Sequence, residues 1–318
     1  MKLLLAGKEG EAFFNLVDEL TIPGLEVARA TTPDEVQAQI ADADIYYGFP
    51  TADLLAKAPA LRWIQSPSAG VEYVARIPEL VESEIILTNT RGAHGPSIGE
   101  HVFALLLALT RRIPTCLEWQ KARHWGRIEG YRTSREIKDS TMGIVGFGAI
   151  GRGVAQRARG FDLHLLAVDA QAVDGGEYVE EVWPASRLPD LLERSNIVVV
   201  ATPLTTETRH LLDAERLAMM QPDSYLIVVS RGGIVEEEAL AAALHQGRLA
   251  GAGIDVTETE PLPPDSPLWD APNLLITPHL AGDSREKEHR CVEILCENLT
   301  RYANGDPLVN VVDKRLGY

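Results

Sequence analysis

The sequence "TMGIVGFGAIG", residues 141–151, carries the strongest indication of a fold in this chain. An apolar run leads into Gly146, Gly148 and Gly151, which have the spacing G-x-G-x-x-G, and a helix-like pattern follows. The spacing alone is a weak signal, but a strand before it and a helix after it are typical of a dinucleotide-binding turn. The first glycine permits a tight bend, the second lets the backbone approach a pyrophosphate, and the third lets helix and strand pack closely. The helix N-terminus then offers N–H groups and a positive dipole to the phosphates.

Asp169 ends the apolar run that follows this turn. A carboxylate at that place accepts hydrogen bonds from the adenine-side ribose hydroxyls and repels a 2′-phosphate. The following residues, "DAQAVD" (169–174), contain no arginine that would hold such a phosphate. We therefore predict NAD rather than NADP as the cofactor. The alternative is that the glycines merely form a turn and that Asp169 merely closes a strand.

Short apolar runs alternate with helix-like segments on both sides of the glycine turn, which predicts doubly wound parallel sheets. The apolar runs lie at 2–7, 43–49, 61–68, 84–90, 164–170, 196–203, 225–232, 251–257 and 273–279. The helix-like segments include 33–41, 95–125 with an interruption near Pro114, 234–249 and 284–304. A whole alternating domain precedes the turn, and we expect the final helix to pack back against that domain. The predicted fold class is α/β with two doubly wound parallel-sheet domains.

Composition limits the class of protein further. The chain has 318 residues, enough for two domains, and a net charge of −16, which argues against a nucleic-acid partner. The longest apolar run, 101–110, is too short for a membrane span, so we expect no membrane association. The three cysteines, Cys116, Cys291 and Cys296, form no CxxC pair and no metal-ligand set. We expect a cytoplasmic protein without a bound metal.

Distinctive residues stand at the carboxyl ends of four successive predicted strands, the edge at which parallel sheets bind ligands. They are Thr202 and Pro203 in "VVVATPLTTET", Arg231 in "IVVSRGG", Asp255 and then Glu260 in "GIDVTETEP", and His279 in "LITPHLAG".

An arginine, a carboxylate and a histidine at one sheet edge form a usable catalytic set. Arginine can hold a substrate carboxylate in a bidentate fork, and histidine can give and take a proton near neutral pH. A nearby carboxylate favours the imidazolium form. Each residue also has a plainer interpretation: Arg231 as a surface residue, Glu260 as a solvated loop residue with Glu258 as a competing candidate, and His279 as a polar residue closing a strand.

These motifs together resemble the D-isomer-specific 2-hydroxyacid dehydrogenases. The resemblance rests on "GIVGFGAIG…VD", "VVSRGGIVEEEAL", "GAGIDVTETEPLPPDSPLW", "LLITPHLAG" and "TNTRGAHGPSIGEHVFALLLAL", and it spans about residues 60 to 305. It places the family's catalytic residues on Arg231, Glu260 and His279, and the acid immediately before the proline selects Glu260 over Glu258. The family's loop for the substrate carboxylate falls on "SPSAGVEYV", with Ala69, Gly70 and Val71 as candidates, although many members have more glycines there.

The resemblance also implies a domain plan. A Rossmann cofactor domain, 96–284, is expected to be inserted into a flavodoxin-like substrate domain, 1–95 plus 285–318, with hinges near 95 and 284. A dimerisation helix and arm at 96–130 would make the protein a homodimer, and so apolar a helix as 99–113 needs more cover than one small domain gives.

The implied reaction is reversible hydride transfer between NAD(H) and a 2-oxo acid or D-2-hydroxy acid. Arg231 would hold the substrate carboxylate, His279 would donate the proton, and Glu260 would keep His279 charged and oriented. Besides the residues named above, we expect cofactor contacts from Ala149, Ile150, Thr208, Ser230, Asp255 and Gly282.

The particular 2-oxo acid stays open at this level. Tyr46, Tyr73 and Trp125 would suit a bulky acid such as phenylpyruvate if they lined the site, but they can equally be core residues. His94 would face the substrate or serve structure. Glyoxylate, hydroxypyruvate and a phosphoglycerate dehydrogenase-like activity remain alternatives, as does a non-enzymatic protein that senses NAD.

Overall fold

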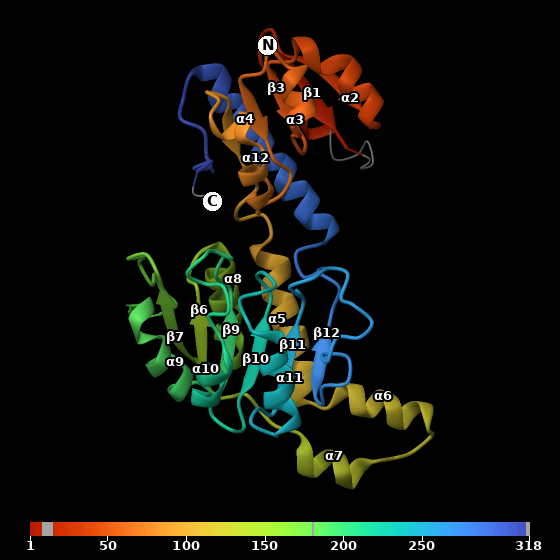
Figure 1. The fold of residues 1–318 in the computed structure, drawn as a ribbon, viewed down its shortest axis with the longest axis vertical. Coiled ribbons are helices and arrows are strands. Elements are labelled where there is room, and N and C mark those ends of the chain that lie inside the picture. The colour runs from red at the N-terminus through yellow and green to blue at the C-terminus, as the bar shows by residue number, and fades with distance from the viewer. Residues whose placement is uncertain (8–14, 180, 316–318) are drawn as a thin grey trace. The chain divides into compact units, whose positions relative to one another are not determined.

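The computed structural model describes residues 1–7, 15–179 and 181–315, and the chain divides into two compact units. Unit 1 comprises Met1–His94 with Ser284–Tyr318, and unit 2 comprises Gly95–Asp283. Each unit is a parallel sheet with helices on both faces (Figure 1). The predicted fold class, α/β with two doubly wound parallel sheets, is confirmed.

The sheet of unit 1 has five strands among the described residues, in the order β2-β1-β3-β4-β5. The strands are β1 (Lys2–Ala6), β2 (Glu26–Ala30), β3 (Ile45–Tyr47), β4 (Trp63–Gln65) and β5 (Ile86–Thr88). The helices are α1 (Asn15–Asp18), α2 (Pro33–Gln39), α3 (Ala52–Ala56), α4 (Pro78–Val81) and α12 (Arg285–Asn304), with 3₁₀ turns at Ile40–Asp42 and Glu72–Arg76. One core joins the sheet to α2, α3 and α4, and a second core joins its other face to α1 and α12. Both faces of the central strands are therefore buried, as parallel sheets require.

Capping residues set the ends of the predicted helices in unit 1. Thr32 and Glu35 form a capping box at the start of α2, and Pro33 occupies its first turn. Ser284 caps α12 by accepting a hydrogen bond from the Lys287 N–H, and Gly305 ends this helix in the left-handed region with φ 74°.

A buried polar network ties α12 to the sheet of unit 1. The Trp63 Nε1–H donates to Thr88 Oγ1 at 2.7 Å, and Thr88 Oγ1 donates to Gln65 Oε1 at 2.8 Å. Asn298 of α12 donates to the same Gln65 oxygen at 3.0 Å. Because every member has a partner, the network adds specificity without leaving a buried polar group unpaired.

The sheet of unit 2 has seven strands among the described residues, in the order β12-β11-β10-β9-β6-β7-β8. The strands are β6 (Thr141–Val145), β7 (His164–Asp169), β8 (Val182–Pro184), β9 (Ile197–Val200), β10 (Tyr225–Val228), β11 (Gly251–Ile254) and β12 (Leu274–Ile276). The helices are α5 (Gly95–Thr110), α6 (Ile113–Lys121), α7 (Arg127–Thr133), α8 (Ala149–Ala158), α9 (Leu188–Arg194), α10 (Ala214–Met219) and α11 (Glu237–His245), with 3₁₀ turns at Arg159–Phe161 and Ala185–Arg187. Helices α5 and α8 cover one face, and α9, α10 and α11 cover the other (Figure 1).

Glycines allow α5 and α8 to pack closely. A methyl group on Gly99 of α5 would lie 2.8 Å from the Gly153 carbonyl, and one on Gly153 of α8 would lie 2.7 Å from the Gly95 carbonyl. Real Cβ atoms do not approach a carbonyl so closely, so both positions require glycine for this contact.

The structure differs from the sequence prediction in three places. Strands β2 and β8 were not predicted, since β2 contains the charged Glu26 and Arg29 and β8 spans three residues at the sheet edge. The interruption expected near Pro114 in the helix 95–125 lies two residues earlier, at Arg112, which adopts the left-handed region with φ 59° and separates α5 from α6. Part of the expected connector 130–140 belongs to helix α7.

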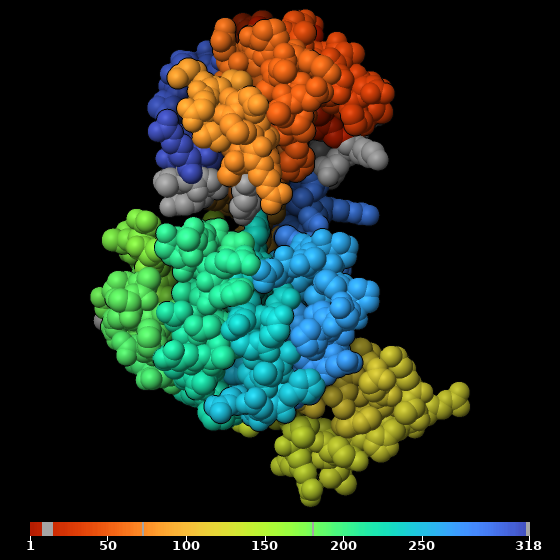
Figure 2. Space-filling view, in the orientation of Figure 1, coloured from red at the N-terminus to blue at the C-terminus, as the bar shows by residue number. Residues whose placement is uncertain are grey.

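Helices α6 and α7 form an arm that extends from the rest of unit 2 (Figures 1 and 2). Neither helix has a buried residue. Large apolar side chains are exposed along the arm: Ile113, Leu117, Trp125, Ile128 and Tyr131. Within residues 1–7, 15–179 and 181–315, none of the helices has the length and apolarity that a bilayer span requires.

Candidate active site

In the turn after β6, each of the three glycines is required or favoured for a different structural reason. Gly146 has φ 93°, and a methyl group there would lie 2.7 Å from the Thr202 N atom. A methyl group on Gly151 would overlap the Gly146 carbonyl. Gly148, the N-cap of α8, differs because no atom lies within 4 Å of the place where its Cβ would be. The open space in front of Gly148 therefore fits a phosphate group at the start of α8, where Ala149 and Ile150 begin the helix.

Asp169 at the end of β7 is fixed across this turn. Its Oδ2 accepts the Phe147 N–H at 2.7 Å, and its Oδ1 accepts the Gln171 N–H at 2.9 Å. Each oxygen keeps a further lone pair for a ribose hydroxyl. Arg152 of α8 donates to the Asp174 carbonyl and lies 4.9 Å over the Phe147 ring, so this guanidinium already has protein partners.

The loop after β9 lies beside the glycine turn, as the approach of Gly146 to Thr202 shows. Thr208 closes this loop: its hydroxyl donates to the Pro203 carbonyl at 2.7 Å and accepts the Thr205 N–H at 2.7 Å.

Ser230 follows the neighbouring strand β10 and is 4% exposed. Within the described residues, its Oγ is buried and has no hydrogen-bond partner. A buried hydroxyl of this kind is normally satisfied, so Ser230 fits a contact with a bound ligand.

His279 and Glu260 form a close pair at the carboxyl edge of the sheet. The His279 Nδ1 lies 2.8 Å from Glu260 Oε2, and Glu260 Oε1 accepts the Thr257 N–H at 3.1 Å. Both side chains are partly exposed, at 46% and 39%. Glu258, the competing candidate, contacts Arg209 and lies 3.4 Å from His210. The structure therefore pairs Glu260, and not Glu258, with His279.

Asp255 directly follows β11 and organises the turn that carries His279. Its carboxylate is 1% exposed and accepts the Leu280 N–H at 3.0 Å and the Ala281 N–H at 2.8 Å. Its carbonyl accepts the His279 N–H at 2.7 Å. Asp255 thus has protein donors on both carboxylate oxygens, and its contact with a cofactor stays a prediction. The expected contact of Gly282 with the cofactor also stays a prediction. The Gly282 carbonyl accepts a hydrogen bond from the Ser97 hydroxyl at 3.1 Å.

Arg231 stands just beyond β10, next to the loop that leads to Glu260. Its Nη1 donates to the Ser230 carbonyl at 2.8 Å. A methyl group on Gly232 would overlap the Thr257 carbonyl, so these two loops are in direct contact. Since β10, β11 and β12 are parallel neighbours, Arg231, Glu260 and His279 belong to one edge of one sheet. A guanidinium, a carboxylate and an imidazole at this edge can bind an anion and transfer a proton.

In the loop after β4 in unit 1, two backbone carbonyl groups accept hydrogen bonds from side chains. Asn89 donates to the Ala69 carbonyl at 2.9 Å, and Thr90 donates to the Pro67 carbonyl at 3.0 Å. Within the described part of the chain, the N–H groups of Ala69, Gly70 and Val71 donate to no protein acceptor. Such a run of N–H groups can bind a carboxylate.

The aromatic residues considered for the substrate have different surroundings. Tyr46 belongs to the core, and its burial, together with the nearby Tyr73, raises the pKa of its hydroxyl to about 12. Tyr73 donates to Ser66 Oγ at 3.0 Å and packs edge-on against the partly exposed Phe49. Trp125 is 88% exposed on the arm. His94 is the residue at which the first segment of unit 1 ends.

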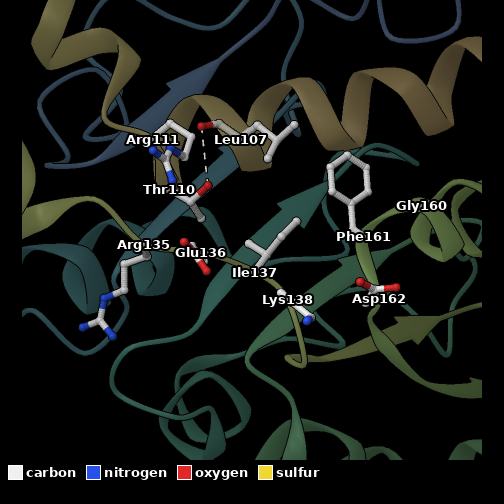
Figure 3. A pocket seen from close by; sticks show the side chains of 10 residues that line it. All are labelled: Leu107, Thr110, Arg111, Arg135, Glu136, Ile137, Lys138, Gly160, Phe161 and Asp162. Carbon is white, nitrogen blue, oxygen red and sulfur yellow. Dashed lines mark hydrogen bonds between the residues drawn. The ribbon is translucent and has the colours of Figure 1, made fainter.

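A cavity of about 300 Å³ lies at the opposite edge of the unit 2 sheet (Figure 3). Its lining includes Ile137 and Lys138, which precede β6, and Phe161 and Asp162, which precede β7. The glycine turn and His279 follow their strands, so this cavity is separate from the candidate active site.

Known proteins match both the sequence and the fold. The model of the "D-isomer specific 2-hydroxyacid dehydrogenase, NAD binding domain" matches residues 103–281. A glyoxylate reductase of Thermofilum pendens is 36% identical over 267 residues, which is 83% of this chain and 78% of that protein. A crystal structure of a D-isomer specific 2-hydroxyacid dehydrogenase family protein from Aeromonas salmonicida has a TM-score of 0.85 and 33% identity, and covers 98% of this chain and 99% of its own.

A structure with lower sequence identity to this chain contains a bound dinucleotide. It is an NADPH-dependent glyoxylate/hydroxypyruvate reductase of Sinorhizobium meliloti in complex with NADP and sulfate, with a TM-score of 0.84 and 26% identity, covering 100% of this chain and 99% of its own.

The chain belongs to the D-isomer specific 2-hydroxyacid dehydrogenase family. It is an oxidoreductase that acts on the CH–OH group of its substrate with a nicotinamide dinucleotide. The predicted family, enzyme class and D-2-hydroxyacid dehydrogenase function are confirmed by these comparisons.

Proposed function

We propose that this enzyme reduces a small 2-oxo acid to the D-2-hydroxy acid with NADH, and that His279 is the proton donor. The observation that carries the proposal is the 2.8 Å pair of His279 Nδ1 and Glu260 Oε2, at the sheet edge that also bears Arg231. A base oriented by a carboxylate, beside a guanidinium, is the set that carbonyl reduction of a 2-oxo acid needs.

The pair supports a role for one particular nitrogen of His279. Glu260 as a carboxylate can only accept a hydrogen bond, so the His279 Nδ1 carries the proton of their contact. The Nε2 atom is then the one that exchanges a proton with the substrate oxygen. Arg231 binds the substrate carboxylate, and the Glu260 carboxylate orients the His279 ring for the proton transfer.

The cofactor is assigned to unit 2 by residues of this chain. The open space at Gly148, the unpartnered Ser230 hydroxyl and the Asp169 carboxylate all fit a bound dinucleotide. When bound, its nicotinamide supplies or accepts the hydride. Asp169 favours NADH because a carboxylate repels a 2′-phosphate, and Arg152 already has the Asp174 carbonyl and the Phe147 ring as partners.

Unit 1 is assigned to the substrate. We propose that the N–H groups of Ala69, Gly70 and Val71 contribute to binding the carboxylate. The names of relatives favour glyoxylate or hydroxypyruvate as the class of substrate. The core position of Tyr46 removes one reason to expect a bulky acid.

The three free cysteines agree with a reduced, cytoplasmic setting.

A second copy of this chain is proposed to cover the arm formed by α6 and α7. The arm exposes five large apolar side chains, and burial of such surface in a symmetric dimer is the usual way to remove it from water.

A substrate panel tests the function. The purified protein is mixed with NADH or NADPH and with glyoxylate, hydroxypyruvate, pyruvate or phenylpyruvate, and absorbance is followed at 340 nm. We expect the fastest oxidation with NADH and a small 2-oxo acid. If NADH binds but no 2-oxo acid is reduced, the protein is a sensor of the dinucleotide and the proposal is wrong.

A further inference from the structure

Helix α5 contacts both ends of the turn that carries His279. Ser97 Oγ donates to the Gly282 carbonyl at 3.1 Å, and His101 Nε2 lies 2.9 Å from Thr277 Oγ1. Ser97 and His101 are four residues apart, so they lie on one face of the helix. The His101 side chain is largely buried, at 16% exposure, although α5 consists mainly of apolar residues.

The hydrogen-bond donors in this contact can be assigned. Thr277 Oγ1 donates to Asp255 Oδ1 at 2.5 Å, which uses its single proton. The same oxygen must therefore accept from His101, whose Nε2 carries a hydrogen. The result is a directed chain from His101 through Thr277 to Asp255, and His101 Nε2 also lies 3.6 Å from Asp255 Oδ1.

Asp255 passes this constraint to His279. Its carboxylate accepts the N–H groups of Leu280 and Ala281, and its carbonyl accepts the N–H of His279. His279 has φ 53°, in the left-handed region, which a non-glycine residue adopts only when its surroundings hold it there. Thus the orientation of His279 toward Glu260 depends on a carboxylate that is itself held by Thr277.

We propose that His101 is a positioning residue for the reaction. By donating to Thr277 it fixes the Asp255 carboxylate, and through it the backbone of the turn at 277–282, so that His279 keeps its contact with Glu260. This inference rests on the proposed role of His279 as proton donor.

Two substitutions at His101 test the role. Gln retains an N–H donor at a similar distance from the backbone, whereas Leu does not. We expect His101→Leu to lower kcat with glyoxylate and NADH about tenfold or more, with the KM for glyoxylate, the Kd for NADH and the Tm close to wild type. His101→Gln is expected to recover most of kcat. A merely structural role would lower the Tm of both variants and leave kcat of the folded fraction unchanged.

Glu100→Gln is the matched control on the same helix turn. Glu100 is exposed and pairs with Arg157 at 3.1 Å, so its loss is expected to leave kcat unchanged. Wild-type kcat in His101→Leu, or equal losses in the Leu and Gln variants, overturns the proposal.

Thr277 gives a second route to the same answer if His101→Leu does not fold. Thr277→Val removes the hydroxyl with little change of shape, and Thr277→Ser restores it. We expect Thr277→Val to lower kcat and Thr277→Ser to recover it. In the double variant Thr277→Val with His101→Leu, we expect kcat to fall no further than in the more impaired single variant. Additive losses, or full activity of Thr277→Val, contradict the shared route. Failure of the proposed function is distinguishable, because it would appear as activity retained by His279→Gln.

Discussion

At the scale of a single residue, Asp169 carries the proposed preference for NADH over NADPH. Its oxygens accept the N–H groups of Phe147 and Gln171, which places negative charge at the end of β7. We expect Asp169→Ser to raise the ratio of kcat/KM with NADPH to kcat/KM with NADH by about tenfold or more, because repulsion of the 2′-phosphate disappears. Asp174→Ser, on the same loop, is the control. A ratio that stays constant would show that other groups select the cofactor.

The identity of the site residues was partly readable from the sequence. Strand ends and the order of motifs predicted Arg231, Glu260 and His279 at one edge, and spacing alone left Glu258 as an alternative. The structure distinguishes the two acids because Glu258 has Arg209 and His210 as partners. Neither partner is near Glu258 in sequence, so no local pattern could show this.

Asp255 and His101 illustrate what the sequence could not show. Asp255 stands at a strand end, which is where a ligand contact is expected, yet its donors come from a turn 25 and 26 residues further along the chain. His101 lies in an apolar helix and meets a partner 176 residues away. Long-range hydrogen bonds of this kind leave no periodicity in the sequence.

At the scale of elements, the start of α11 holds the loop that carries Glu260. Glu237 Oε1 accepts the Glu258 N–H at 2.5 Å. Burial raises the pKa of Glu237 above its usual value of 4.5, with a further contribution from the charges of Glu258, Glu238 and Glu260. The folded chain therefore holds this proton to a higher pH than the unfolded chain does. Consequently the free energy of unfolding falls as pH rises from about 4.5 through the raised pKa.

Glu237→Gln keeps an acceptor oxygen and removes the charge. We expect its Tm to exceed that of wild type at pH 7 and to equal it at pH 4, where Glu237 is protonated in both states. Thermal unfolding at the two pH values measures this, with the exposed Glu215→Gln of α10 as control. If Glu237→Gln raised the Tm equally at both pH values, ionisation of Glu237 would be excluded as the cause of the increase.

Most elements were predictable because their signals are local. The cap at Thr32 and Pro33 predicted α2, and the glycine turn predicted β6 and α8. Strand β8 has three residues, and strand β2 is interrupted by the charged Glu26 and Arg29, so neither shows the apolar run that marks the central strands. The interruption of the helix 95–125 was predicted near Pro114 and lies at Arg112, because Pro114 stands in the first turn of α6 and the left-handed backbone of Arg112 precedes it.

At the scale of the whole molecule, the arm makes a prediction about assembly. Its apolar side chains, Ile128 among them at 65% exposure, have no cover within the chain's described residues. We expect sedimentation to give twice the mass of one chain, and Leu117→Glu with Ile128→Glu to shift the protein to the monomer. Lys121→Ala, on the exposed part of α6, is the control and should remain a dimer. A wild-type monomer would remove the proposed interface.

The central claim is that His279 transfers the proton, and His210 provides a matched control. Both histidines adopt the left-handed region, with φ 53° and 50°, and both face a glutamate, at 2.8 Å and 3.4 Å. The deciding measurement is kcat for reduction of glyoxylate together with the Kd for NADH, in His279→Gln and in His210→Gln. We predict that His279→Gln loses about a thousandfold in kcat, the scale of general acid catalysis, with little change in the Kd for NADH, while His210→Gln keeps its kcat. Near-normal turnover in His279→Gln, or equal losses of turnover and NADH affinity, would contradict the assignment.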